Sequence, residues 1–141
     1  MDLRVRMLAA VLAIGAVGLS ACGNGAEPST DLAVTTTEFQ FSPQTWTVPA
    51  GEEISIDITN SGTVVHEWVL LKPGVTISSE ADLPETEEEL LADFVYIEDE
   101  VDPGTTKTLT FTAPAAGTYQ VICAIPGHFG GGMEATLNVT G

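Results

Sequence analysis

Residues 117–139 read GTYQVICAIPGHFGGGMEATLNV, and this stretch indicates two β-strands joined by a glycine-rich loop. Tyr119, Val121 and Cys123 occupy alternate positions in the first strand, so the pattern that buries the first two also directs the cysteine inward. Residues 135–140 alternate in the same way and predict the second strand. The connection between the two strands therefore begins at an inward-facing thiol.

The loop carries a cysteine, a histidine and a methionine at equal intervals. Four residues separate Cys123 from His128, and four more separate His128 from Met133. The Pro-Gly pair before His128 provides a turn that brings this residue back toward Cys123. Residues 130–132 are all glycine and let the backbone approach a metal without side-chain clashes. A loop with this spacing can fold around one metal ion.

The sequence after residue 31 indicates an all-β sandwich. Short runs of β-branched and aromatic residues are separated by proline and glycine every eight to twelve residues. Ile54, Ile56 and Ile58 alternate with polar residues, which predicts a strand with one buried face. Further strands are predicted over residues 32–41, 45–48, 66–71, 94–97 and 106–112.

The long connection over residues 75–103 is the one helical candidate. Pro84 suits the first helical turn with Asp82 as its cap, and the acidic run 85–89 favours the positive end of a helix. Apolar residues follow the acidic run and supply a stripe for packing: Leu90, Leu91 and Phe94. We expect a short helical flap here.

Four side chains offer nitrogen and sulfur donors for one metal ion: His66, Cys123, His128 and Met133. Beyond the first 22 residues, they are the only histidines, cysteine and methionine of the chain. Two imidazoles and a thiolate in a plane, with a weak axial thioether, suit copper that alternates between two oxidation states. Zinc gains nothing from a thioether, and structural zinc usually takes four Cys or His ligands. We therefore predict one copper ion.

The loop and the strand before it resemble the C-terminal copper loop of the cupredoxin (type 1 blue copper) family, which includes auracyanin, azurin, rusticyanin and plastocyanin. The motifs Cys-x-x-Pro-Gly-His and Gly-Thr-Tyr, four residues before the cysteine, carry the resemblance. It implies a Greek-key β-sandwich of seven to eight strands with a short helical flap. It also assigns the ligand roles to His66, Cys123, His128 and Met133.

Two features depart from the pattern of this family. Glu67 stands where many relatives have an asparagine that ties the two ligand loops together by hydrogen bonds. In addition, the domain has no second cysteine, so the disulfide found in azurin cannot form. The stability of the domain is therefore expected to come from packing.

The N-terminus has the pattern of an exported protein. Two arginines precede an apolar run over residues 7–19, which is too short to cross a bilayer as a helix and fits a secretory signal. The Leu-Ser-Ala-Cys that follows resembles a lipobox and predicts lipidation of Cys22; the alternative is an ordinary signal peptide cut nearby. We expect residues 1–21 to be the signal peptide, 22–31 a flexible tether and 32–141 the domain.

The composition is strongly acidic, with a formal net charge of −16 over the 141 residues. Without residues 1–21, two lysines stand against 19 acidic residues, and this charge excludes nucleic acid as a partner. It favours a basic docking partner, a salty habitat or simple solubility. The acidic residues over 85–102 lack the ligand spacing of a calcium loop, so we interpret them as a solvated face.

These observations predict a monomeric carrier that shuttles single electrons between redox partners outside the cytoplasmic membrane. A lipid on the carrier would anchor it to that membrane. The partners would be cytochromes or membrane respiratory or photosynthetic complexes. An enzyme is not expected, because copper oxidases and nitrite reductases need further histidines. Ile125 and Phe129 beside His128 suggest an apolar docking patch, and the alternative is plain packing of Phe129 against the loop. The alternatives are copper storage, delivery or sequestration, and an adhesive lipoprotein without metal.

Overall fold

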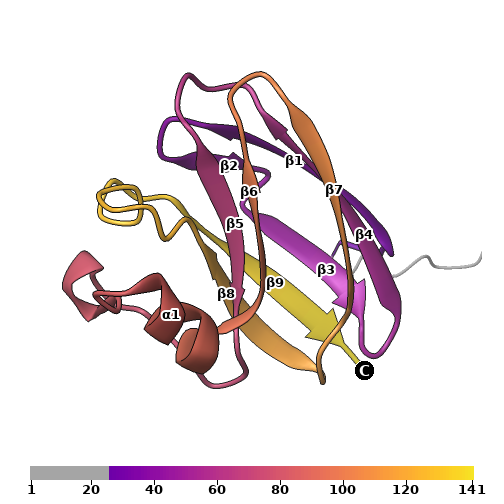
Figure 1. The fold of residues 1–141 in the computed structure, drawn as a ribbon. Helices are drawn as coiled ribbons and strands as arrows, with labels where there is room; N and C mark the ends of the chain where they lie inside the picture. Colours follow the sequence, from indigo (N-terminus) through magenta and orange to yellow (C-terminus); the bar gives the residue numbers. More distant parts are fainter. Residues whose placement is uncertain (1–25) are drawn as a thin grey trace, which may run out of the picture.

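The computed structural model describes residues 26–141, and the predicted signal peptide and Cys22 lie outside these residues. Within the described part, nine strands form two sheets that pack face to face (Figure 1). The strands are β1 (Asp31–Thr37), β2 (Gln40–Ser42), β3 (Thr45–Pro49), β4 (Glu53–Asn60), β5 (His66–Leu71), β6 (Val95–Val101), β7 (Thr106–Thr112), β8 (Gly117–Ile122) and β9 (Glu134–Thr140).

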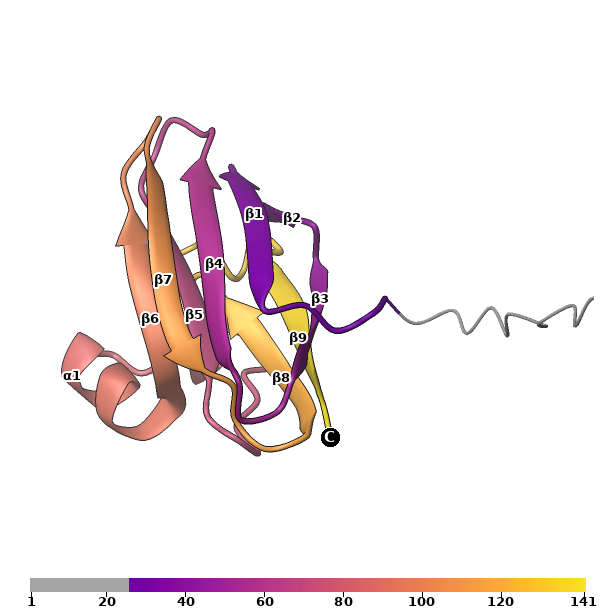
Figure 2. The same ribbon diagram turned by 90° about the vertical axis from the view of Figure 1, so that its right-hand side faces the viewer.

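The strand order of the two sheets is β2-β1-β4-β7 and β3-β9-β8-β5-β6. β1 pairs with β4 and β3 with β9 in parallel, whereas the other neighbours are antiparallel. Figure 2 shows β1, β4 and β7 side by side across the front of the sandwich. This arrangement confirms the predicted Greek-key β-sandwich, although the described residues form nine strands where seven to eight were expected.

Alternation along the strands fills the space between the two sheets. Ile54, Ile56 and Ile58 of β4 are fully buried, whereas Ser55 and Asp57 between them are not. Aromatic rings from both sheets meet in the same core, where the indole of Trp68 lies edge-on to Trp46 and tilted against Phe111. Burial of apolar surface in this core is the main stabilising contribution to the sandwich.

β5 is buried on both of its faces, which strict alternation does not predict. Trp68 and Leu70 face the main core, whereas Val69 and Leu71 belong to a second apolar cluster. Residues from the long connection pack against this cluster and so cover the outer face of the five-stranded sheet (Figure 1): Val75, Leu83, Leu90 and Phe94. The flap therefore shields the strand that carries the first predicted ligand.

The helical flap exists, but it begins later than predicted. A 3-10 turn (Glu80–Asp82) precedes α1 (Glu87–Glu89), which continues into a π-type segment (Leu90–Phe94). Thr86 caps α1, because its hydroxyl accepts a hydrogen bond from the Glu89 N–H. The prediction of Asp82 as the cap was wrong, since its carboxylate instead accepts a hydrogen bond from the hydroxyl of Ser79.

Two strand boundaries also differ from the expected ones. The run over residues 32–41 is divided into β1 and β2 by a turn at Glu38 and Phe39, where Phe39 adopts a positive φ of 62°. β6 extends four residues beyond the predicted end at Ile97, because it pairs with β5 as far as Val101 opposite His66. Within residues 26–141, no helix is long and apolar enough to cross a membrane.

Candidate metal centre

Three of the four predicted ligands come together at one end of the sandwich. His66 is the first residue of β5, Cys123 directly follows β8, and His128 lies in the loop between β8 and β9. Their donor atoms all lie within 4.8 Å of one another. His66 and Cys123 have no exposed surface and His128 is 9% exposed, so the three donors face a site almost closed to solvent.

The imidazole of His66 is the clearest sign that this site holds a metal ion. Neither Nδ1 nor Nε2 has a hydrogen-bond partner in the described part of the chain, although both atoms are buried. A neutral imidazole can donate one hydrogen bond and accept another, and leaving such buried groups unpaired is costly. A metal ion at the site would satisfy one of these nitrogens. The donor set therefore fits an ion that prefers nitrogen and sulfur.

Met133 lies in the same loop, and its backbone joins the other two ligands of that loop. The Cys123 N–H donates to the Met133 carbonyl at 3.1 Å, and the Met133 N–H donates to the His128 carbonyl at 3.1 Å. The Met133 residue is fully buried. These contacts support Met133 as the fourth ligand, which stays a prediction.

A tight turn returns the ligand loop, residues 123–133, toward the cysteine. The His128 N–H donates to the Ile125 carbonyl at 3.0 Å, and Gly127 between them has a φ of 86°. Only glycine adopts this conformation without steric cost. As a result, His128 Nδ1 lies 3.3 Å from Cys123 Sγ. The expected turn at the Pro-Gly pair is therefore present.

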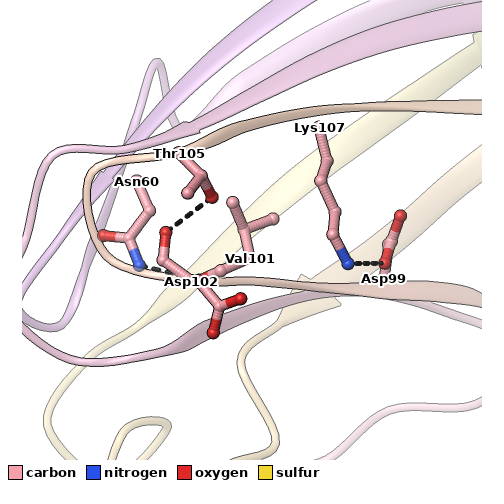
Figure 3. Close-up of polar contacts among 6 residues, drawn as sticks. All are labelled: Asn60, Asp99, Val101, Asp102, Thr105 and Lys107. Atoms are coloured by element: carbon pink, nitrogen blue, oxygen red, sulfur yellow. Dashed lines mark hydrogen bonds and ion pairs between the residues drawn. The ribbon is translucent and has the colours of Figure 1, made fainter.

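Asn60 fixes the end of β5 where His66 lies. Figure 3 shows its side-chain amide directed at the backbone of β6 beside Val101. Its fully buried side chain donates from Nδ2 to the carbonyls of Val64 and Val101, both at 2.8 Å. Its Oδ1 accepts a hydrogen bond from the Gly62 N–H at 2.9 Å. Val101 is the residue opposite His66 in the β5–β6 ladder, so Asn60 holds both the loop before His66 and the strand beside it.

The same view shows how the neighbouring turn between β6 and β7 is closed (Figure 3). The Thr105 hydroxyl donates to the Asp102 carbonyl at 2.8 Å, and Lys107 forms an ion pair with Asp99 at 3.1 Å. Sequence analysis did not identify Asn60, because no local pattern indicates its hydrogen bond to β6. Such a role depends on tertiary contacts that no local pattern records.

Glu38 holds the loop before His66 from the other side. Its carboxylate accepts hydrogen bonds from the backbone N–H and from the hydroxyl of Thr63. The backbone hydrogen bond from Thr63 is the main reason why the pKa of Glu38 falls to about 2. Sequence analysis did not identify this residue, because a single acidic residue in a turn has no distinguishing pattern.

Glu67 replaces the asparagine of the family pattern, yet it still connects the two ligand segments. Its backbone N–H lies 3.4 Å from Cys123 Sγ and donates to the sulfur. Burial, together with the charges of Glu98 and Glu100, raises the pKa of the Glu67 carboxyl to about 6. A hydrogen bond from the Ala124 backbone opposes this increase. The carboxyl therefore lies at the contact between β5 and the ligand loop.

The protonation states of the ligands follow from their burial. Burial raises the pKa of the Cys123 thiol to about 11, although hydrogen bonds from the Glu67 and Ile125 backbones lower it. Burial lowers the pKa of His66, and the neighbouring His128 lowers it further. Burial also lowers the pKa of His128, against the charges of Glu80 and Glu38. Both imidazoles are thus neutral at pH 7 and retain a lone pair for a metal.

The apolar neighbour of His128 is Phe39, and not Phe129 as the sequence suggested. The Phe39 ring lies edge-on to the His128 ring, with 4.9 Å between the ring centroids. Phe39 is 41% exposed, whereas Phe129 is 8% exposed and packs into the second cluster beside Ile77. The hairpin between β1 and β2 therefore supplies an aromatic side chain that sequence analysis missed.

The comparisons with known proteins agree with this architecture. A family model described as a cupredoxin-like domain matches residues 7–133. The chain is 31% identical over 156 aligned positions to auracyanin-A of Chloroflexus aurantiacus, which covers 92% of this chain and 94% of that protein. It spans about half of auracyanin-B from the same organism, 47% of its length. Auracyanin A is described as a "blue" copper protein.

Two further similarities extend the comparison. The copper-resistant cuproprotein CopI of Rubrivivax gelatinosus is 31% identical over 107 residues, which cover 71% of this chain and 59% of that protein. Among solved structures, the reduced auracyanin of Roseiflexus castenholzii superposes with a TM-score of 0.65 at 27% identity. That superposition covers 81% of this chain and 99% of the auracyanin.

Proposed function

The chain belongs to the cupredoxin-like family, and from this premise we propose that it carries single electrons through a copper ion held by His66, Cys123, His128 and Met133. Copper as the predicted cofactor is confirmed by the family and by the three converging donors. The four-ligand set and the carrier role are the proposal. The observation that carries it is the buried His66 ring beside Cys123 and His128, with neither nitrogen paired by any of residues 26–141.

The chain holds these donors in fixed positions, which is what a fast carrier requires. When bound, copper supplies a one-electron couple, and a site that changes little between the two oxidation states exchanges electrons rapidly. Asn60 fixes the strand end that carries His66. Backbone hydrogen bonds within the ligand loop fix Cys123, His128 and Met133 relative to one another. Both ligand segments are thus set by the fold before any metal binds.

His128 is the proposed point where electrons enter and leave. It is the only one of the four predicted ligands with any exposed surface, and its ring meets the half-exposed ring of Phe39. Phe39 is among the large apolar side chains that remain exposed in the described part of the chain. An exposed aromatic ring beside the most accessible ligand supports docking of a redox partner at this end.

The charge of the chain supports a basic redox partner, such as a cytochrome or a membrane respiratory or photosynthetic complex. A groove of about 270 Å³ lies beside the ligand loop, and Glu67, Glu85 and Glu87 line it together with Leu90 and Pro126. Complementary charges steer association and weaken as the salt concentration rises. We propose that the protein acts as a monomer, since its site is built from one chain.

The proposed location is outside the cytoplasmic membrane, facing the periplasm or the cell exterior. The sequence supports it through the apolar N-terminal run and the lipobox-like residues before Cys22. In this proposal residues 1–21 are removed, Cys22 bears the lipid, and the residues that follow tether the domain to the membrane. The domain begins slightly earlier than the predicted residue 32, because β1 starts at Asp31 and the Ser29 N–H already donates to the Thr47 carbonyl. Labelling with a radioactive fatty acid tests the anchor, because Cys22→Ser should then lose the label.

A second candidate function is copper storage, delivery or sequestration by the same ligands. The similarity to the copper-resistant cuproprotein CopI favours this candidate. Its distinguishing property is copper exchange, because a storage or delivery protein must release the ion to an acceptor. A carrier must instead retain copper through many cycles of oxidation and reduction. The proposal of no enzymatic activity rests on the absence of further histidines in the sequence.

The decisive experiment is a titration of the purified copper-free chain with copper(II). We expect an intense blue band from charge transfer between the Cys123 thiolate and copper, followed by a reversible one-electron wave in voltammetry. Cys123→Ser should remove the blue band. A colourless wild-type protein would overturn the proposal. Rapid copper loss to a chelator, together with slow electron exchange with a cytochrome, would instead support the delivery function.

A further inference from the structure

The carboxylate of Glu80 bridges two backbone N–H groups of the ligand loop. Its Oε1 accepts a hydrogen bond from the Gly127 N–H, and its Oε2 accepts one from the Gly130 N–H, both at 2.6 Å. These two glycines stand directly before His128 and two residues after it. One carboxylate therefore holds the chain on both sides of the proposed electron-exchanging ligand. We refer to this contact as the Glu80 bridge.

The Glu80 bridge supplies acceptors that the loop itself does not provide. The loop's own carbonyls accept the N–H groups of its other turns, namely Gly131 to Gly127, Gly132 to Phe129 and Met133 to His128. The Gly127 and Gly130 N–H groups point instead to the carboxylate. Hydrogen bonds from backbone N–H groups to an ionised acceptor are shorter and stronger than neutral ones.

Glu80 is held in place by its own segment, independently of the ligand loop. Ile77 is 2% exposed in the second apolar cluster. The side chain of Gln120 in β8 accepts a hydrogen bond from the Ile77 N–H at 2.9 Å and donates to its carbonyl at 3.0 Å. The Leu83 N–H closes a turn on the Glu80 carbonyl at 3.2 Å. The carboxylate is thus attached to the sheet through a fixed support.

The position leaves little room for a side chain on the loop at the point of contact. A Cβ added at Gly130 would lie 3.2 Å from Glu80 Oε2, which is tighter than nine in ten such contacts, and 3.5 Å from Glu80 Cβ, which is an ordinary van der Waals distance. The absence of a side chain at Gly130 therefore permits the short distance between backbone and carboxylate. The loop and the flap match each other in shape as well as in hydrogen bonding.

We propose that Glu80 is a positioning residue of the metal centre, which holds the His128 segment in its ligand-ready shape and places a fixed negative charge beside it. The inference rests on the proposed copper function for the second of these effects. Without the bridge, two backbone N–H groups of the ligand loop lose their hydrogen-bond acceptor, and the backbone on either side of His128 becomes more mobile. Without the charge, the more positive, oxidised copper ion is less favoured, so the reduction potential rises.

The first test uses the copper-free protein and therefore does not depend on copper chemistry. Glu80→Ala removes both acceptors, whereas Glu80→Gln keeps one oxygen and turns an amide toward the other N–H. Asp82→Asn is the matched control, because Asp82 lies on the same turn and bonds to Ser79 rather than to the loop. Amide hydrogen exchange at Gly127 and Gly130 should accelerate about tenfold or more in Glu80→Ala, and less in Glu80→Gln.

Exchange at the β4 amides serves as the internal reference for an intact fold, since this strand lies in the other sheet. If exchange at Gly127 and Gly130 in Glu80→Ala equals that of Asp82→Asn, the bridge does not hold the loop and the inference is overturned. Because this readout needs no metal, it separates a failure of the inference from a failure of the proposed copper function.

The second test uses the copper-loaded protein. Glu80→Ala should raise the reduction potential above that of Asp82→Asn and should release copper to a chelator about tenfold faster. Glu80→Gln should raise the potential similarly but release copper more slowly than Glu80→Ala. If the loop amides are deprotected while potential and copper release match the control, the bridge is structural only, and its role at the metal centre is refuted.

Discussion

Replacing His66 by leucine should stabilise the copper-free protein while it abolishes copper binding. Both ring nitrogens of His66 are buried, neither has a hydrogen-bond partner among the residues that the structure describes, and the residue has no exposed surface. A buried unpaired polar group costs about 1–3 kcal/mol, so the two nitrogens together oppose folding by at least that amount. Leucine has a similar volume, and such exchanges in a core cost less than about 1.5 kcal/mol. With about 1–3 kcal/mol for each of the two nitrogens and up to about 1.5 kcal/mol lost in repacking, the expected net gain lies between about 0.5 and 6 kcal/mol of unfolding free energy.

The assay is urea denaturation of the copper-free wild type and of His66→Leu, followed by the fluorescence of the two buried tryptophans, Trp46 and Trp68. With a urea slope of about 1–3 kcal/mol per M, the midpoint should rise by about 1 M at an unchanged slope. The same comparison in the presence of copper should have the opposite sign, because only the wild type gains binding energy.

His128→Leu is the matched control for this experiment. His128 is 9% exposed and its Nδ1 lies 3.3 Å from Cys123 Sγ, so less unpaired polar surface is removed and the gain should be smaller. A copper-free His66→Leu protein that unfolds at lower urea than the wild type would refute the reasoning. That result would mean that the unpaired His66 nitrogens do not lower the unfolding free energy of the copper-free protein.

Three further predictions concern the residues around the site. The pKa of Glu38 is lowered from its usual 4.5 to about 2, so the stabilisation from its charged form is complete above pH 4.5 and is lost as the pH falls toward 2. Glu38→Gln should therefore flatten the pH dependence of the urea midpoint between these two pH values. A pH profile identical to that of the wild type would contradict this prediction. Asn60→Ala leaves buried backbone groups unpaired and should lower the unfolding free energy by about 2–4 kcal/mol, measured by urea denaturation. A loss below about 1 kcal/mol would show that Asn60 does not anchor the end of β5 that begins with His66. Phe39 is 41% exposed, so Phe39→Gly loses about 1–2 kcal/mol of apolar burial and regains about 1–2 kcal/mol from its positive φ. The variant should therefore stay within about 1 kcal/mol of the wild type in urea denaturation but exchange electrons more slowly in voltammetry, and an unchanged rate of electron exchange would exclude a role for the Phe39 ring.

Local patterns were sufficient to predict the parts of the site that lie close together in sequence. The alternation that buries Tyr119 and Val121 also places Cys123 inside, and the structure confirms it. The Pro-Gly turn and the following glycines likewise follow from backbone sterics. His66 required a different argument, because its approach to the loop depends on the pairing of β5 with β8, and chemistry alone selected it as the missing donor.

The supporting residues could not be predicted, and the reason is physical. Glu80 and Gly127 are separated by 47 positions, and their contact depends on how the flap packs against the sheet. Asn60 bonds to Val101 across 41 positions for a similar reason. A carboxylate or an amide that binds a distant backbone leaves no periodicity in the sequence. The capping role of Thr86 was not predicted, because several residues that can cap a helix lie within a few positions of one another.

The acidic composition has two physically different parts, and only one of them is a matter of solubility. The carboxylates of Glu38 and Glu80 accept backbone hydrogen bonds from the segments that carry His66 and His128, and Glu67 lies against the backbone beside the cysteine. A neutral amide side chain at these three positions would accept weaker hydrogen bonds from the backbone N–H groups. Each carboxylate instead adds negative charge near a centre whose donors already include a thiol, and such charge favours the oxidised, more positive ion. The three carboxylates therefore make the two ligand segments rigid and also set the preference of the site between its oxidation states. As a result, a substitution at these positions changes rigidity and reduction potential together.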